Sequence, residues 1–202
     1  MFKRLLHLPF IVLALYACGS GATLRVGEPA PGFEGMDTGG NVHRLADYRG
    51  KTVVLEWTNH DCPYVRKHYG AGNMQAQQRE AAAQDVIWLS VISSAPGKQG
   101  HVSPAEADEL TRNRNAAPHA VILDSEGTIG QAYEARTTPH MFIIDGAGKL
   151  VYMGGIDSIT TANPDDIPGA TQHIRVALQE IAAGKPVSTP VTKPYGCSVK
   201  YR

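Results

Sequence analysis

The 202-residue sequence has little that would direct it to a charged partner or hold it in a membrane. Its 19 basic and 19 acidic residues leave no net charge at pH 7, which argues against nucleic acid and anionic membrane surfaces as electrostatic partners. It has no internal repeat, no low-complexity segment and no apolar run long enough to span a bilayer. Its length fits one domain with a substantial core and short flanking segments.

Cysteine is scarce, with three residues in the whole chain. Cys18 lies near the N-terminus, where a signal or a lipid would remove it from redox chemistry, which leaves Cys62 and Cys197. In an oxidising compartment two thiols permit a disulfide pair but do not prove one.

The first residues have the parts of a secretory signal. Lys3 and Arg4 precede an apolar stretch over residues 9–17, and small residues follow to residue 22. We therefore expect a signal peptide over 1–22 and export to a bacterial periplasm. A lipoprotein signal over 1–17 is the alternative, in which Cys18 becomes a lipid anchor; the bulky Tyr16 fits that motif poorly.

Apolar runs and helix signals alternate over residues 23–184 and predict one α/β domain, with a mixed central sheet flanked by helices on both faces. A turn at 37–41 is expected to join two short strands. One helix should begin at Pro63 and continue to Ala83. Residues 185–202 are rich in proline and glycine and predict an extended tail that carries Cys197. The further strands are expected at 52–58, 85–93, 120–123, 140–144 and 150–153, and the further helices at 104–113, 129–135 and 171–183. Ser103 and Glu106 have the spacing of a capping box at the start of the helix over 104–113.

Cys62 lies between a buried strand and the helix that Pro63 begins. A thiol at this junction meets the positive end of the helix dipole and unpaired backbone N–H groups, and both favour the thiolate. Arg66 and Lys67 add positive charge one turn later, whereas Asp61 opposes it. The position predicts a nucleophile; a buried, unreactive cysteine is the alternative.

Two separated motifs resemble the thioredoxin-like redoxins. The segment DCPYV around Cys62 is similar to the active-site segment of that family, and Thr137-Thr138-Pro139 before the hairpin HMFIIDGAGKLVYMGG is similar to its cis-proline loop. The resemblance covers residues 25–184 and implies a thioredoxin-like fold near peroxiredoxins and periplasmic membrane-tethered thioredoxins. It also implies that Pro139 is cis and lies against Cys62. Pro63, Thr138 and Pro139 would then contact substrate, with the backbone of Thr138 binding a peptide or thiol.

The sequence departs from these families at positions that limit the reactions it can catalyse. The second cysteine of a Cys-x-x-Cys motif is replaced by Val65, which excludes a local disulfide cycle. Peroxiredoxins are expected to have threonine or serine three residues before their cysteine and proline four residues earlier still; Asn59 and Leu55 stand there. Arg136 loosely matches the arginine that polarises a peroxide in that family.

Glu56 lies in the apolar strand segment VVLEW, where a charged side chain is costly to bury without partners. It precedes Cys62 by six residues, the offset at which thioredoxins place a buried carboxylate. The resemblance therefore implies a proton acceptor with a raised pKa. An outward-facing glutamate on an edge strand is the alternative.

The histidines offer a metal site as a further alternative. Cys62, His140 and Cys197 have the soft and imidazole ligands that copper(I) accepts, and His60 precedes Cys62 by two residues. Hydrogen-bonded or solvent-facing histidines are the simpler interpretation, so we expect neither a metal nor a cofactor.

The sequence favours an exported thiol-disulfide oxidoreductase. Cys62 would attack a disulfide, sulfenic acid or peroxide of a protein or small molecule, and Cys197 would resolve the product. A thiol peroxidase, a copper(I)-handling protein and a lipid-anchored binding protein without turnover are the alternatives. The sequence identifies neither the substrate nor the reductant that restores the thiols.

Overall fold

The computed structural model describes residues 24–202. The signal peptide expected over 1–22, the alternative lipoprotein signal and Cys18 lie outside the described residues. Within that range, no helix has the length and apolar character needed to cross a membrane.

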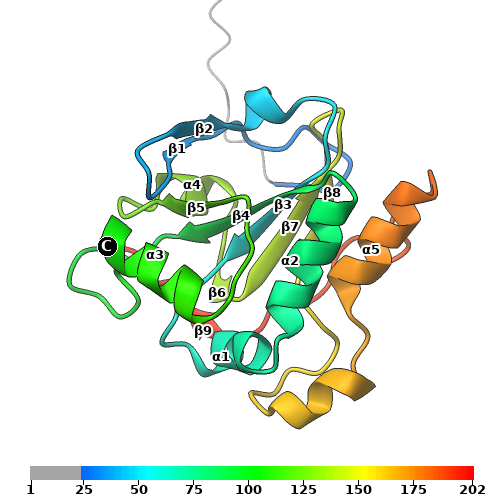
Figure 1. The fold of residues 1–202 in the computed structure, drawn as a ribbon. Coiled ribbons are helices and arrows are strands. Elements are labelled where there is room, and N and C mark those ends of the chain that lie inside the picture. The colour runs from blue at the N-terminus through cyan, green and yellow to red at the C-terminus, as the bar shows by residue number, and fades with distance from the viewer. Residues whose placement is uncertain (1–23) are drawn as a thin grey trace, which may run out of the picture.

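A five-stranded mixed sheet forms the centre of the molecule, in the order β5-β4-β3-β7-β8 (Figure 1). Strands β3, β4 and β5 are parallel, whereas β7 runs antiparallel to β3 and β8 antiparallel to β7. This arrangement confirms the mixed sheet expected from the sequence. The strands are β3 (Val53–Trp57), β4 (Ile87–Ile92), β5 (Ala120–Leu123), β7 (His140–Ile144) and β8 (Leu150–Gly154).

Helices lie on both faces of this sheet. One face packs against α1 (Pro63–Gly70), α2 (Asn73–Ala83) and α5 (His173–Ala182), with α3 (Pro104–Asn113) packed beside β5. The other face packs against α4 (Thr128–Ala132) and the 3-10 helix η1 (Leu45–Tyr48). The remaining elements are the hairpin β1 (Glu34–Met36) and β2 (Val42–Arg44), and the 3-10 helix η2 (Pro164–Gly169).

One helix prediction was wrong and another was confirmed. The single helix expected from Pro63 to Ala83 is two helices, because Gly72 between them takes a left-handed conformation with φ of 72° that glycine adopts at little cost. The start of α3 is a capping box as expected: the Ser103 N–H donates to Glu106 at 2.7 Å, and the Glu106 N–H donates to Ser103 Oγ at 3.3 Å.

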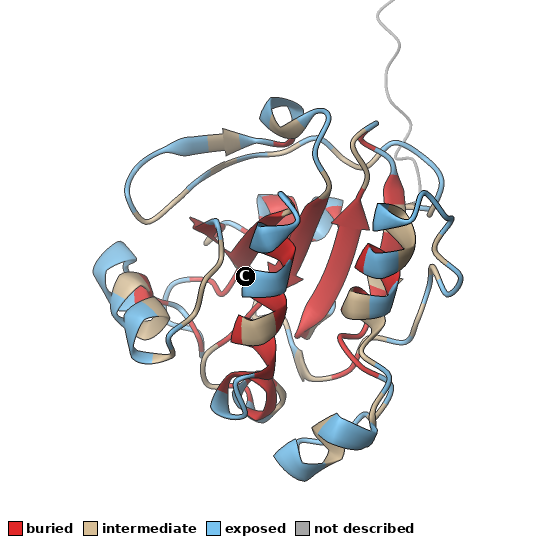
Figure 2. Ribbon diagram, turned by 45° about the vertical axis from the view of Figure 1, so that its right-hand side comes forward, coloured by how far each residue is buried: buried red, intermediate tan, exposed pale blue. Residues whose placement is uncertain are grey.

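Alternate residues of β3 divide the core into two layers, and Figure 2 shows the central strands buried throughout. Leu55 and Trp57 face the first layer, where Trp57 packs edge-on against Phe142. Val54 faces the second layer, together with Glu56. The second layer holds buried polar side chains as well as apolar ones, and it is the layer on which Cys62 lies.

Residues 185–202, called the tail below, run in extended form along the sheet and back to the cysteine end of the molecule. The Met153 N–H of β8 donates to Pro190 O at 3.0 Å, and the Thr192 N–H donates to Met153 O at 3.1 Å. Farther along, β9 (Cys197–Ser198) pairs antiparallel with β6 (Thr137–Thr138). The tail therefore contacts the domain at β8 and again at β6.

Candidate active site

Cys62 is the N-terminal cap of α1, at the end of the loop that leaves β3. Its carbonyl accepts the first helical hydrogen bond, from the Arg66 N–H at 2.9 Å, and Pro63 occupies the first helical position. The cysteine is fully buried at 0% exposure, whereas Pro63 beside it is exposed. This is the strand-to-helix junction that the sequence predicts.

The second thiol reaches Cys62 through the pairing of β6 with β9. Cys197 pairs directly with Thr138, and its N–H donates to Cys62 Sγ at 3.4 Å. The Cys62 thiol in turn donates to Thr138 O at 3.0 Å. Gly196 permits this approach, because a Cβ there would lie 2.0 Å from Thr138 O. Two cysteines separated by most of the domain thus meet beside Thr138, and both are free thiols.

The two thiols have opposite acidities. Burial raises the pKa of Cys62, but hydrogen bonds from the Cys197 side chain, the Val65 backbone and the Cys197 backbone outweigh it, so the pKa lies below that of a free thiol. Burial and the neighbouring Cys62 raise the pKa of Cys197 to about 11. Cys62 is therefore the more acidic thiol of the pair, and Cys197 the less acidic one.

The Thr138-Pro139 bond is cis, as the resemblance implies. Thr138 and Pro139 are buried next to Cys62, and the backbone edge of Thr138 is the one expected to bind an incoming peptide. In this structure the chain's own Cys197 pairs with that edge. An extended substrate and the docked tail would therefore compete for the same backbone groups.

Glu56 is fully buried on the central strand β3, so the alternative of an outward-facing edge-strand glutamate is wrong. Its carboxylate accepts from Tyr69 at 2.9 Å and from Trp88 at 2.8 Å. Ser90 and Gln78 donate to it at 3.0 and 3.2 Å. These four donors compensate the buried charge, and among the described residues neither thiol donates to it. Its proton-accepting role stays a prediction.

The remaining candidates lie around the cis-proline loop. The Arg136 guanidinium is exposed and pairs with Glu134 at 3.3 Å, so its action on a peroxide stays a prediction. His140 Nδ1 accepts from the Arg136 N–H at 3.2 Å, and burial lowers the pKa of His140 to about 3. Within residues 24–202, no three histidine, cysteine or acidic side chains are grouped closely enough to hold a metal ion. The copper(I) alternative therefore gains no support.

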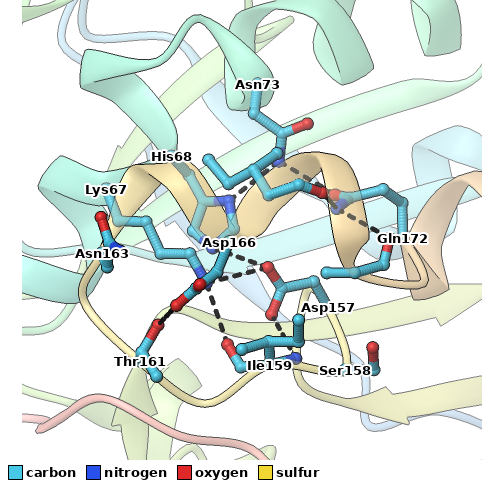
Figure 3. A network of polar contacts seen from close by, with 12 residues as sticks. Lys67, His68, Asn73, Asp157, Ser158, Ile159, Thr161, Asn163, Asp166 and Gln172 are labelled. Atoms are coloured by element: carbon cyan, nitrogen blue, oxygen red, sulfur yellow. Dashed lines mark hydrogen bonds and ion pairs between the residues drawn. The ribbon is translucent and has the colours of Figure 1, made fainter.

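Sequence reasoning missed the role of a buried network on α1, of which Figure 3 shows Lys67, His68 and Asp157. Lys67 was expected to add positive charge beside Cys62, but its Nζ forms a fully buried ion pair with Asp157 at 3.0 Å. Arg66 is likewise paired, with Asp61 at 3.1 Å. His68, next to Lys67, and Tyr195 of the tail complete the network. No periodicity marked these residues, because their partners lie far away in the chain.

Comparison with known proteins shows which family the chain belongs to. The model of a family described as the AhpC/TSA family matches residues 26–153, more than half of the chain. A thiol-disulfide oxidoreductase named ResA from Geobacillus kaustophilus is 26% identical over 132 residues, covering 62% of this chain and 66% of that protein. The ResA of Geobacillus thermodenitrificans is 27% identical over the same shares. The matches thus span just under two thirds of the length of these relatives.

Solved structures show that the fold is thioredoxin-like. A crystal structure of an uncharacterized conserved protein from Geobacillus kaustophilus has a TM-score of 0.76 and 25% identity, over 89% of this chain and 94% of that one. A putative thiol:disulfide interchange protein DsbE from Chlorobium tepidum has a TM-score of 0.52 and 24% identity, over 65% and 85%. The expected fold class is confirmed. The first of these matches also extends well beyond the length of the family match.

Proposed function

The chain belongs to the AhpC/TSA family, and we propose that it is a thiol-disulfide oxidoreductase with Cys62 as nucleophile and Cys197 as resolving thiol. The observation that carries this proposal is the contact between the two, in which the Cys197 N–H donates to Cys62 Sγ at 3.4 Å. The relatives named as thiol-disulfide oxidoreductases support the same reaction class.

The reaction runs in two balanced steps. The Cys62 thiolate attacks one sulfur of a substrate disulfide, which breaks the S–S bond, forms a mixed disulfide and releases the first substrate thiol. Cys197 then loses its proton and attacks Cys62 Sγ, which forms the Cys62–Cys197 disulfide and releases the second substrate thiol. The substrate disulfide is reduced and the two cysteines are oxidised; an external dithiol reverses the change in the protein.

The opposite pKa shifts assign these roles. A lowered pKa leaves Cys62 ionised at lower pH than a free thiol, so Cys62 attacks first. Cys197, with a pKa of about 11, needs a base to remove its proton. Glu56 is our candidate for the proton acceptor, acting through intervening groups, since among the described residues its carboxylate accepts from Trp88 and Ser90 and from neither thiol.

The residues around the two cysteines and the N-terminal sequence complete the proposal. Pro63, Thr138 and Pro139 would contact the substrate, and Arg136 would act only if the substrate is a peroxide. The N-terminal sequence supports export to the periplasm, with Cys18 as the position of a lipid anchor in the alternative processing. The domain would then be 23–184, with the tail as the carrier of the resolving thiol.

Single-cysteine variants test the chemistry. Reduced wild-type protein, mixed with a small aromatic disulfide, should release two substrate thiols and show one peptide pair joining Cys62 to Cys197 after digestion without reductant. Cys197→Ser should release one thiol and stop at the mixed disulfide, and Cys62→Ser should release neither. Two free thiols in oxidised wild type, or links only between molecules, would contradict the proposal.

A peroxide in place of the disulfide tests the peroxidase alternative in the same apparatus. Because Asn59 and Leu55 depart from the peroxiredoxin pattern and Arg136 pairs with Glu134, we expect the peroxide to consume the thiols more slowly than the disulfide. If the peroxide consumes the thiols faster than the disulfide does, peroxide reduction would replace disulfide reduction as the proposed function.

A further inference from the structure

The tail is fastened to α1 by one side chain, Tyr195. Its hydroxyl donates to Asp157, and it accepts from Lys67 Nζ at 3.4 Å. His68 Nε2 lies 3.2 Å from the same oxygen. The Tyr195 ring packs edge-on against Tyr64 with 5.8 Å between ring centres, and Lys67 Nζ lies 5.5 Å from its centre. We call Lys67, His68, Asp157 and Tyr195 the tail anchor.

The part of the tail anchor that belongs to the domain is buried and held by an ion pair and hydrogen bonds. Lys67 and Asp157 are both fully buried, so each charge depends on the other, and the Ile159 carbonyl holds Lys67 Nζ at 2.9 Å as well. Figure 3 shows Lys67 extending from α1 toward Asp157. The anchor thus offers the tail hydroxyl a fixed position at the helix that begins with Cys62.

His68 supplies a neutral donor to this position. Its Nδ1 accepts from the Asn73 side chain at 2.8 Å, which leaves the proton on Nε2, on the side of Tyr195. Burial outweighs the attraction of Asp157 and lowers the pKa of His68 to about 4, so the ring is neutral in the working range of most enzymes. The Tyr195 oxygen therefore receives hydrogen bonds from Lys67 and His68 and gives one to Asp157.

Only Gly196 separates the anchored tyrosine from Cys197. The position of the Tyr195 hydroxyl therefore largely determines where Cys197 meets Thr138 and Cys62. The same docked segment also covers the nucleophile: Cys62 is fully buried, and the Cys197 N–H points at its sulfur. An external disulfide reaches Cys62 after the tail has moved, whereas the resolving step needs the tail back in place.

We propose that Tyr195 is a positioning residue whose hydroxyl, held by Lys67, His68 and Asp157, sets the balance between a docked tail that resolves and an undocked tail that admits substrate. This proposal rests on the proposed function of the two cysteines. It predicts opposite effects on the two chemical steps when the hydroxyl is removed. General loosening of the fold has no reason to slow one step while it speeds the other.

Tyr195→Phe tests this prediction because it keeps the ring and removes only the hydroxyl. We expect the first thiol of a small aromatic disulfide to be released about tenfold faster, and the second about tenfold more slowly, since hydrogen bonds to charged groups are the stronger class. Stopped-flow absorbance resolves the two releases. His68→Gln, which leaves the Lys67–Asp157 pair intact, should move both rates in the same directions by about threefold.

The matched control is Tyr201→Phe. Tyr201 lies on the other side of Cys197 in the same tail and donates to the uncharged Ala135 carbonyl at 2.8 Å. Because this bond is neutral and lies away from α1, both releases should change by less than about twofold. Effects of equal size in the two tyrosine variants, or two rates that change in the same direction in Tyr195→Phe, would overturn the proposal.

A second readout separates this inference from the proposed function. In a Cys62→Ser background, alkylation of Cys197 reports tail docking without any disulfide chemistry, and Tyr195→Phe should raise its rate about tenfold over Tyr201→Phe. If that rise appears while the wild type forms no Cys62–Cys197 disulfide, the proposed function fails and the anchoring of the tail holds. An unchanged alkylation rate removes the anchoring role, whatever the cysteines do.

Discussion

Cys62 is positioned by the main chain of the central sheet and α1, whereas Cys197 lies on an extended tail that is docked by the pairing of β9 with β6 and by the side chain of Tyr195. The family match over 26–153 contains the first cysteine and ends before the second. The proposed nucleophile thus lies inside the family match, and the proposed resolving thiol lies in a segment beyond it. This difference separates the two chemical steps structurally, because the tail can be perturbed while the strand-to-helix junction remains.

The two layers of the core also differ in how far they depend on buried polar side chains and their partners. The layer around Trp57 and Phe142 is mostly apolar and aromatic, although the Trp57 indole N–H donates to Ser93 Oγ at 3.0 Å. The layer on the cysteine side buries Glu56, Lys67 and Asp157, each held by named partners. Buried polar groups stabilise a structure only when every partner is present, so substitutions on this side should cost most.

The largest effect is expected from Lys67→Met, which breaks the domain side of the tail anchor. Because Asp157 would remain buried without its cation, the free energy of unfolding should fall by about 3–5 kcal/mol. Denaturant titration measures this loss. Lys51→Met is the matched control: its pair with Asp85 at 2.6 Å is exposed, so the expected loss is about 1 kcal/mol or less. Equal losses would show that the buried pair contributes no more than a surface one.

Glu56→Gln should have the next largest effect. The glutamine amide would place N–H groups against the donors of Trp88 and Ser90, so we expect a loss of about 1–3 kcal/mol in unfolding free energy with the fold retained. If Glu56 accepts the Cys197 proton, release of the second substrate thiol should also slow near neutral pH. Unchanged release rates between pH 6 and 9 would leave Glu56 with a structural role alone.

The sequence predicted the parts of the molecule that local patterns encode. The strand before Cys62, the proline that begins α1 and the capping box of Ser103 all depend on neighbours in sequence, and all three were correctly placed. The single helix to Ala83 was wrong because Gly72, a residue that weakens the middle of a helix, takes a left-handed conformation and separates two helices.

Long-range side-chain partners were beyond such patterns. Lys67 was interpreted as a charge near Cys62, but Asp157, 90 residues later, pairs with it. Tyr195 carried no signal at all, since its importance depends on where the tail docks. The pairing of Cys197 with Cys62 was reached by elimination, as the only other thiol after residue 18, and the structure supports it with a contact that the sequence could not supply.

Gly196→Ala should undock the tail near Cys197 and leave the domain folded. A Cβ at this position would lie 2.0 Å from Thr138 O, and the φ of 135° disfavours any side chain. We expect β9 to leave β6, with a loss of about 1–2 kcal/mol in unfolding free energy and faster alkylation of Cys197. Gly184→Ala, at a positive φ but with open space around it, is the control for backbone strain alone. Equal alkylation of Cys197 in the two variants would show that the close contact at Thr138 is unimportant.

The smallest expected effect concerns the acidity of Cys62, to which the two regions contribute together. Hydrogen bonds from the tail and from the Val65 backbone oppose burial and lower the pKa of the Cys62 thiol. Cys197→Ala removes the side-chain donor and keeps the Cys197 N–H, so the pKa should rise. Gly196→Ala, which displaces both tail donors, should raise it further, and Cys197→Ser should restore most of the wild-type value through its hydroxyl.

Alkylation of Cys62 against pH measures these shifts, with iodoacetamide as the reagent and mass spectrometry to assign the site. Only the thiolate reacts, so the rate falls as the pH falls through the pKa, and a raised pKa moves the midpoint to higher pH. The rate on the high-pH plateau reports access to the sulfur, so faster access in Gly196→Ala leaves the midpoint interpretable. The same midpoint in wild type, Cys197→Ala and Gly196→Ala would mean that the N-terminus of α1 alone sets the acidity of Cys62. The tail would then supply a resolving thiol without tuning the nucleophile.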